Sequence, residues 1–281
     1  MAESNIPKRQ AMTIDVEDYF HVSAFEKQIC PSSWSGQRLR VDKSTRRVLE
    51  IFDKFDISAT FFILGWVAEA CPQLVKEIAA HGHEIGCHSM NHRRATTQTP
   101  DEFRQDTEQC LKLLQDLTGD PVIGYRAPSF SIDDSNVWAF DVLQELGFKY
   151  SSSTYPVKHD LYGVPDWPRF KYQRPEGIWE IPIPTFYHWG RQIPIGGGGY
   201  FRLFPYWFSK WAISSFLSAE QQPYSFYFHP WEIDKAQPRV EGASFKSRFR
   251  HYTNISSMEH KLENLLRDFS WSSMSRVYAI K

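Results

Sequence analysis

Apolar stretches typical of strands alternate with stretches of helical spacing through the first half of the chain. Residues 11–14 and 59–64 have strand character, and residues 44–55 between them place apolar side chains at helical intervals. Strands that alternate with helices form a parallel sheet with helices packed outside it, because each parallel connection needs a crossover. The alternation therefore predicts an α/β fold, built as a barrel or as a doubly wound sheet.

The same pattern continues to about residue 147. We expect helices over residues 72–80, 99–119 and 134–146, and strands over residues 85–88 and 122–125. Thr99 and Glu102 have the spacing of a capping box, and Pro100 stands at the first helical position between them. Gly82, Gly119 and Gly147 follow predicted helices and are expected to end them.

From about residue 151 the chain is rich in proline and aromatic residues, and regular patterns return after Pro205. Residues 207–217 and 256–269 then have helical spacing, and residues 225–228 have strand character. The glycine run at 196–199 lacks the lysine of a phosphate-binding loop. It predicts a flexible or close-packed loop beside a site, with a plain turn as the alternative. With no internal repeat, the sequence predicts one domain over residues 1–281 with a core over about 11–270.

Charge and composition exclude several classes of function. The net charge of −1 gives no support for nucleic-acid binding. The apolar run at 60–68 is about half the length of a transmembrane helix, and residues 1–10 lack the apolar core of a signal peptide. The four cysteines form no closely spaced pair, which favours reduced thiols. We therefore expect a cytoplasmic protein without a membrane span, with peripheral attachment to the inner membrane as the alternative.

Two histidines end the predicted strand at residues 85–88. His88 stands at its end and His92 follows four residues later. Two imidazoles at this spacing lie on one side of a helical turn, where both can bind one divalent cation. The alternative is a buried structural histidine beside a surface histidine, because the spacing alone is easily met by chance.

Other polar residues also follow predicted strands. Asp15, Glu17 and Asp18 follow the first strand, Arg126 follows the strand at 122–125, and His229 follows the strand at 225–228. The carboxyl ends of parallel strands share one edge of the sheet, where sites form. Together with the two histidines, this set predicts a metal hydrolase with a carboxylate base and a histidine acid.

The motifs that carry these residues resemble those of a known family. The segments TIDVED at 13–18, GHEIGCHSMNH at 82–92, YRAP at 125–128 and FHP at 228–230 are similar to the successive motifs of polysaccharide deacetylases. These proteins carry the NodB homology domain and form carbohydrate esterase family 4. More narrowly, the chain resembles exopolysaccharide deacetylases of PEP-CTERM/exosortase loci, and the resemblance covers most of its length.

The resemblance implies a distorted (β/α) barrel of about seven parallel strands and metal-dependent removal of N-acetyl groups from an N-acetylated glycan. Asp15 would be the general base, and Arg126 would pair with it and hold its orientation. His88 and His92 would bind the cation, and His229 would protonate the leaving amine. Zinc is the expected metal, with Co, Ni or Mn as alternatives, because a mixed nitrogen and oxygen ligand set suits all of them.

Two features depart from the family pattern. Most relatives have adjacent aspartates in the first motif, but Val16 stands at the second position and cannot bind a metal. Strand alternation places Glu17 on the same side as Asp15, and Asp18 is the competing acidic ligand. The Asp-Trp pair that supports the catalytic histidine in the family is not evident near residues 150–153, which leaves open what orients His229.

Substrate contacts and the class of activity have alternatives. Tyr200, Pro128 and Trp231 are the candidate substrate-binding residues, with core packing as the other possibility. Besides a carbohydrate N-deacetylase, the same fold could serve an allantoinase-like amide hydrolase. A catalytically inactive glycan-binding relative is the third possibility, motivated by Val16 and the missing Asp-Trp pair.

Overall fold

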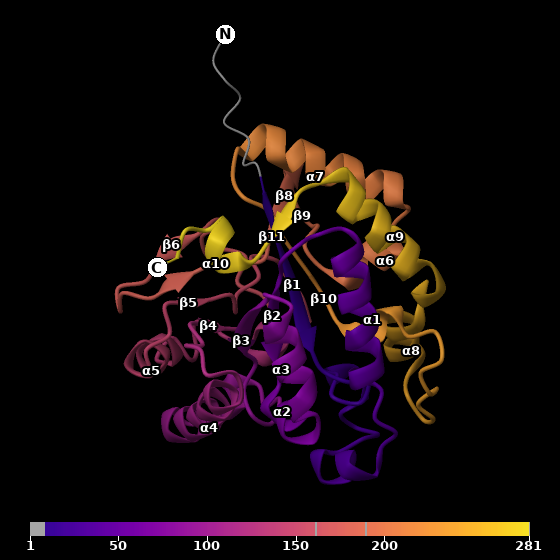
Figure 1. Cartoon of the computed structure of the whole chain (residues 1–281). Coiled ribbons are helices and arrows are strands. Elements are labelled where there is room, and N and C mark those ends of the chain that lie inside the picture. The colour runs from indigo at the N-terminus through magenta and orange to yellow at the C-terminus, as the bar shows by residue number, and fades with distance from the viewer. Residues whose placement is uncertain (1–8, 161, 189, 281) are drawn as a thin grey trace.

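The computed structural model describes residues 9–160, 162–188 and 190–280, and a curled, mostly parallel sheet forms its centre (Figure 1). The strands of this sheet follow the order β10-β1-β2-β3-β4-β5-β7-β6, and β11 pairs with the start of β1. Their bounds are β1 (Gln10–Val16), β2 (Thr60–Ile63), β3 (Glu84–Cys87), β4 (Gly124–Tyr125), β5 (Tyr150–Ser151), β6 (Tyr172–Gln173), β7 (Trp179–Glu180), β10 (Ser225–Phe228) and β11 (Trp271–Ser272).

The strands from β10 to β7 are parallel, and only β6 runs antiparallel, beside β7. No pairing among the described residues joins β10 to β6, so the barrel stays open on that side. The predicted α/β class and distorted barrel are therefore confirmed as a curled, incomplete barrel. Strands β7, β10 and β11 come from the second half of the chain and lie in the same sheet as β1.

Helices surround this sheet (Figure 1). Helix α7 lies across the top of the view, and α9, α6 and α8 lie below it on the right side. The helices are α1 (Val41–Lys54), α2 (Gly65–Ala70), α3 (Pro72–Ala80), α4 (Pro100–Thr118), α5 (Ala139–Glu145), α6 (Gly198–Leu203), α7 (Tyr206–Glu220), α8 (Phe245–Tyr252), α9 (Ile255–Asp268) and α10 (Met274–Val277). None in the described part of the chain is long and apolar enough to span a bilayer.

Alternating side chains of β1 separate an apolar core from a polar interior. Met12, Ile14 and Val16 join the large core cluster, into which α1 contributes Val48 and Phe52. A strand directs successive side chains to opposite faces, so Thr13 and Asp15 share the other face. The arrangement gives β1, buried along its whole length, one apolar face and one polar face.

The predicted helices and strands are largely confirmed, but one helix and one strand are shorter than predicted. The capping box of Thr99 and Glu102 is present, and Gly119 ends α4 with a positive φ of 76°. Helix α5 begins at Ala139 and not near Asp134, because Asp133 and Asn136 form a side-chain turn before it. Strand β4 has only two residues, where the apolar pattern predicted four.

The parallel register brings the ends of several strands to one edge. Val16 pairs with Ile63, Ile63 with Cys87, and Cys87 with Tyr125. The residues that follow these positions and β10, among them Glu17, His88, Arg126 and His229, therefore gather at the carboxyl edge. A separate hairpin of β8 (Thr185–His188) and β9 (Arg191–Pro194) precedes the glycine run.

Candidate metal and catalytic site

Asp15 and Arg126 form a buried ion pair on the polar face of the sheet. The guanidinium Nη1 of Arg126 donates to Asp15 Oδ1 at 2.6 Å and to Thr13 Oγ1 at 2.9 Å. Its other nitrogens donate to the carbonyl and hydroxyl oxygens of Ser152. Arg126 is fully buried and Asp15 is 3% exposed. Arg126 thus holds the Asp15 carboxylate in one orientation.

Glu17, His88 and His92 form a group whose ligand atoms all lie within 4.8 Å of one another. Glu17 Oε2 lies 2.6 Å from His92 Nε2. Glu17 Oε2 is buried, yet it has no hydrogen bond of acceptable geometry with any described residue. A buried carboxylate oxygen beside imidazole nitrogens, without a hydrogen bond, fits a site for a divalent cation.

The ring of His88 is oriented by the backbone of the neighbouring strand. Its Nδ1 lies 2.8 Å from the carbonyl oxygen of Arg126, which can only accept a hydrogen bond. Nδ1 therefore carries the hydrogen, and the lone pair of Nε2 is available to a metal. Burial lowers the pKa of His88 to about 4, which keeps the imidazole neutral as metal binding requires.

The electrostatic environment of Glu17 favours its charged form. Burial raises the pKa of this carboxyl, but the nearby imidazoles of His92 and His229 lower it more, so the net pKa lies well below its usual range. An ionised carboxylate within a group of histidines is the state that binds a divalent cation.

Asp18, the competing acidic candidate, has a different set of partners. Its Oδ2 accepts hydrogen bonds from the backbone N–H groups of Arg40 and Val41 at the start of α1, and its Oδ1 accepts one from Tyr19. Asp18 lies outside the group of Glu17, His88 and His92. The geometry therefore favours Glu17 as the acidic ligand, because Asp18 anchors the amino end of α1.

The expectation that His88 and His92 lie on a helical turn is wrong. The segment between them is an irregular loop in which Ser89 and His92 have positive φ values of 65° and 51°. The side chain of Asp106, from α4, holds this loop by accepting hydrogen bonds from Met90 N and Asn91 Nδ2. Sequence reasoning missed Asp106, because its position on α4 gives no sign that it faces the loop.

Gly65, at the start of α2, lets this loop pack closely. A Cβ at Gly65 would lie 2.3 Å from Met90 Sδ and 3.0 Å from its Cα. The backbone N–H groups of Gly65 and Trp66 donate to the carbonyls of Ser89 and Met90. The two histidines are therefore held by α2 and α4 and not by a helix of their own.

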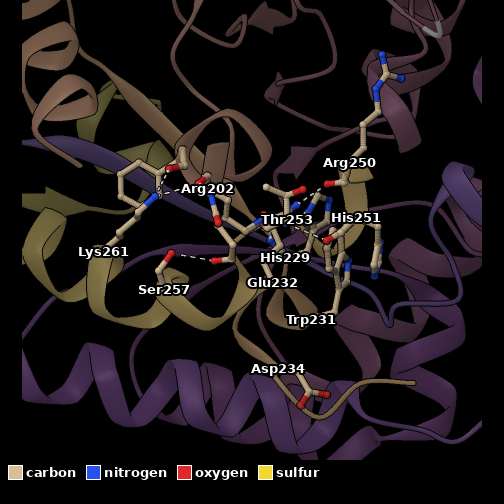
Figure 2. A network of polar contacts seen from close by, with 12 residues as sticks. Arg202, His229, Trp231, Glu232, Asp234, Arg250, His251, Thr253, Ser257 and Lys261 are labelled. Atoms are coloured by element: carbon tan, nitrogen blue, oxygen red, sulfur yellow. Dashed lines mark hydrogen bonds and ion pairs between the residues drawn. The ribbon is translucent and has the colours of Figure 1, made fainter. Parts of the chain in front are cut away.

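His229 follows β10 and faces Glu17. Its Nε2 lies 3.4 Å from Glu17 Oε1, and its Nδ1 lies 2.9 Å from Glu232 Oε1. The other oxygen of Glu232 accepts from Nε of Arg202 at 2.7 Å (Figure 2). Sequence reasoning missed Glu232 and Arg202. The spacing of Glu232 three residues after His229 was visible, but Arg202 comes from a distant segment.

Charge around His229 favours its protonated form. Burial lowers its pKa, but the carboxylates of Glu17 and Glu232 raise it more, to about 9. For Glu232, burial raises the pKa, and the charges of Arg202 and His229 lower it to about 2. The imidazole therefore lies between two carboxylates and can donate a proton from Nε2.

An open cleft of about 460 Å³ lies over this group. Glu17, His92 and His229 line it, and its walls include residues from the segments 22–28 and 244–251. Lys246 and Arg250 on one wall both pair with Asp160 on another. Glu17, His92 and His229 are therefore accessible from this cleft.

The three predicted substrate contacts are placed less favourably. Pro128 is buried and Tyr200 half-buried, and neither is among the residues that line this cleft. Trp231 lines the cleft but is only 7% exposed and stacks on His229 and His251, with centroid separations of 5.0 and 4.1 Å. Trp231 therefore does not offer an open ring face to a sugar, and Pro128 and Tyr200 do not reach the cleft.

Comparison with known proteins divides the chain into two matched regions. The profile of the polysaccharide deacetylase family matches residues 35–151, and that of a domain of unknown function, DUF3473, matches residues 152–279. His88, His92 and Arg126 lie in the first region and His229 in the second, whereas Asp15 and Glu17 precede both.

Two curated relatives illustrate the likeness. A peptidoglycan-N-acetylglucosamine deacetylase of Bacillus cereus is 30% identical over 105 residues, which are 37% of this chain and 47% of that protein. A peptidoglycan deacetylase of Helicobacter pylori is 29% identical over 140 residues, 49% of this chain and 47% of that protein. The chain therefore spans about half the length of these relatives.

Solved structures share the fold over nearly the whole chain. A Mycobacterium smegmatis protein assigned to the polysaccharide deacetylases aligns over 97% of this chain and 91% of its own, with a TM-score of 0.62 and 16% identity. A peptidoglycan N-acetylglucosamine deacetylase aligns over 98% of this chain and 89% of its own, with a TM-score of 0.51 and 14% identity. We conclude that residues 35–151 match the polysaccharide deacetylase family, which is the NodB or carbohydrate esterase 4 type, and that the described chain shares the fold of these two solved structures.

Proposed function

We propose that this chain is a metal-dependent hydrolase that removes N-acetyl groups from a bacterial polysaccharide or from its lipid-linked precursor. The observation that carries the proposal is the convergence at one sheet edge of the group Glu17, His88 and His92 with the Asp15–Arg126 pair and with His229. Such a set supplies a metal site, a base and an acid around one cleft.

Glu17, His88 and His92 would hold one divalent cation through one carboxylate oxygen and two imidazole nitrogens. Three protein ligands leave coordination positions open, as hydrolytic metal sites require. When bound, the cation would polarise the acetamide carbonyl and lower the pKa of water. Zinc is our first candidate because of its availability, and Co, Ni and Mn suit the same donor set.

Asp15 would act as the general base and His229 as the general acid. The attacking water gives its proton to the Asp15 carboxylate while its oxygen forms a bond to the acetyl carbon. His229 Nε2 then gives a proton to the amide nitrogen as the carbon–nitrogen bond breaks, which releases acetate and the free amine of the sugar. Arg126 keeps Asp15 aligned through the 2.6 Å contact.

The lining of the cleft and the names of the relatives both favour a glycan as the substrate. The cleft is open and bordered by polar and charged side chains such as Lys27, Gln28 and Ser247, which suits a hydrated glycan. The resemblance to exopolysaccharide deacetylases favours an exopolysaccharide, and the names of the curated relatives favour peptidoglycan as the other candidate.

Release of acetate from N-acetylated glycans by metal-loaded protein tests the proposal. We expect acetate from at least one exopolysaccharide, peptidoglycan fragment, chitooligosaccharide or lipid-linked glycan, and loss of that activity in Asp15→Asn and His88→Ala. Allantoin and related amides serve as the competing substrates. Turnover of those amides alone, or glycan binding without any acetate release, would overturn the proposed function.

A further inference from the structure

We propose that Glu232 and Arg202 are positioning residues for His229: Glu232 fixes which ring nitrogen faces the cleft, and Arg202 fixes Glu232. This inference rests on the proposed function, in which His229 is the general acid. It also answers the question that the missing Asp-Trp pair left open, because it assigns the support of His229 to residues of the second half of the chain.

Glu232 contacts His229 twice through one oxygen. Its Oε1 accepts a hydrogen bond from the backbone N of His229 at 3.0 Å and lies 2.9 Å from Nδ1 of the ring (Figure 2). An ionised carboxylate only accepts hydrogen bonds, so Nδ1 carries a hydrogen. Nε2 is then the nitrogen directed at Glu17 and the cleft, where a substrate amine would lie.

Arg202 occupies the other oxygen of Glu232. Its Nε donates to Oε2 at 2.7 Å, and its Nη atoms donate to the backbone carbonyls of His251, Thr253 and Arg250. Arg202 is 2% exposed and Glu232 1% exposed, so their contact is largely shielded from water. The arginine thereby keeps the carboxylate directed at His229 and away from the cation site.

The glycine run at 196–199 leaves room for this carboxylate. A Cβ at Gly198 would lie 2.4 and 2.6 Å from the two oxygens of Glu232, and one at Gly197 would lie 2.7 Å from the Tyr227 ring. Arg202 lies in the same short helix that begins at Gly198. Gly196 and Gly197 are therefore a close-packed approach to α6, whereas Gly198 and Gly199 form its first turn, where the sequence predicted a loop. The close packing at Gly198 serves the contact between Arg202 and Glu232.

Trp231 restrains the plane of the imidazole. Its ring stacks on His229 with an interplanar angle of 18° and on His251 with an angle of 13°. The His251 ring is fixed in turn by a 2.6 Å contact between its Nε2 and Gln237 Oε1. His229 is therefore restrained at one ring edge by Glu232 and across its plane by Trp231.

A purely structural role is the competing explanation, since Arg202 also ties down the backbone at residues 250–253. Removing one partner of a buried ion pair destabilises a protein whatever the role of the pair, because the other charge stays buried without compensation. The nearby pair of Asp234 and Arg40 provides a control. The atoms Asp234 Oδ1 and Arg40 Nη2 lie 2.7 Å apart, and the two side chains are 9% and 8% exposed. Asp234 is two residues from Glu232, but the ion pairs of His229 are with Glu17 and Glu232.

The test compares Glu232→Gln, Arg202→Met and Arg202→Lys with the control Asp234→Asn. Each variant is assayed on an N-acetylated glycan and on 4-nitrophenyl acetate, whose phenolate leaves without a proton. In Glu232→Gln and Arg202→Met we expect kcat for the amide to fall roughly 10²-fold with KM within about twofold, and a much smaller loss on the ester. Arg202→Lys should recover part of the loss, and Asp234→Asn should show no difference between the two substrates.

Two measurements distinguish positioning from damage. Metal content and thermal unfolding should be similar in Glu232→Gln and Asp234→Asn. In nitrogen-15 NMR of histidine-labelled protein, the hydrogen-bonded Nδ1–H signal of His229 should persist in Asp234→Asn and move or disappear in Glu232→Gln. Equal losses on both substrates, or an unchanged Nδ1–H signal, would overturn the inference. If the wild type releases no acetate, the proposed function fails. The NMR result still decides whether Glu232 positions the His229 ring.

Discussion

Glu17 and His92 approach each other to 2.6 Å, between Oε2 and Nε2, without forming a well-directed hydrogen bond. Two ligand atoms that converge in this way share a common position in front of them. In the proposed site, the first acidic motif would supply its ligand one residue later than adjacent aspartates would, because the Val16 side chain lies in the core.

Asp15→Asn should abolish most deacetylation while leaving the metal in place. The amide cannot take a proton from water, so we expect kcat to fall roughly 10²- to 10⁴-fold. Metal content, measured by elemental analysis, should stay at the wild-type value because Asp15 is outside the ligand group. Loss of the metal together with activity would instead make Asp15 a ligand.

His229→Ala should remove the alkaline limb of the pH profile. The pKa of His229 is raised to about 9 in the metal-free protein, so its proton is present below that pH and lost above it. A bound cation offsets the charge of Glu17 and moves this limb to lower pH. The profile of kcat/KM between pH 5 and 10 should be bell-shaped in the wild type. An alkaline limb that persists in His229→Ala would exclude the proposed acid role.

Asp106→Ala should weaken metal binding although Asp106 is no ligand. Its carboxylate accepts from Met90 N and Asn91 Nδ2, which lie between the two histidines. Residues that orient ligands typically contribute 10- to 100-fold to metal affinity, and we expect a loss of that order. Asp116→Ala is the matched control, because Asp116 lies on the same helix with its side chain 64% exposed. Similar metal affinity in both variants would contradict this account.

His83→Gln should reduce acid destabilisation. Burial lowers the pKa of His83 to about 4 from an ordinary value of 6.5, and its Nδ1 accepts from Ala59 N. Below pH 6.5 His83 is protonated in the unfolded chain but stays neutral in the folded chain. The free energy of unfolding therefore falls as the pH drops to about 4. The loss is on the order of 3 kcal/mol for this residue.

Thermal unfolding between pH 7 and 4 measures the effect of His83. His83→Gln should show a shallower fall of Tm with decreasing pH than the wild type. His260→Gln, at an exposed position on α9, is the control variant. Parallel curves for His83→Gln and the wild type would contradict a buried neutral His83.

The order of strands and helices in the first half could be predicted because local patterns determine it. Each of these patterns spans only a few residues: the capping box at Thr99, the glycines that end helices, and the apolar faces of the helices. The positions of His88, Arg126 and His229 at strand ends followed from the same patterns, since parallel strands end at one edge.

The missed features depend on contacts between distant segments. Arg202 reaches Glu232 across 30 positions, and Asp106 holds a loop 15 and 16 positions away. The choice between Glu17 and Asp18 as the acidic ligand likewise depended on where α1 begins. The backbone N–H groups of Arg40 and Val41 at its start donate hydrogen bonds to the Asp18 carboxylate. No local pattern encodes these contacts.

The central claim is that Glu17, His88 and His92 bind one divalent cation, and metal content per chain tests it most directly. The measurement compares the wild type with Glu17→Ala, His88→Ala and Asp18→Asn. Asp18→Asn should unfold at a lower temperature, because the amide accepts the three backbone hydrogen bonds less strongly. We predict about one divalent ion per chain in the wild type and in Asp18→Asn, and none in the other two variants. A wild type that stays empty after reconstitution with zinc, or a Glu17→Ala variant that keeps its ion, would contradict the proposed site.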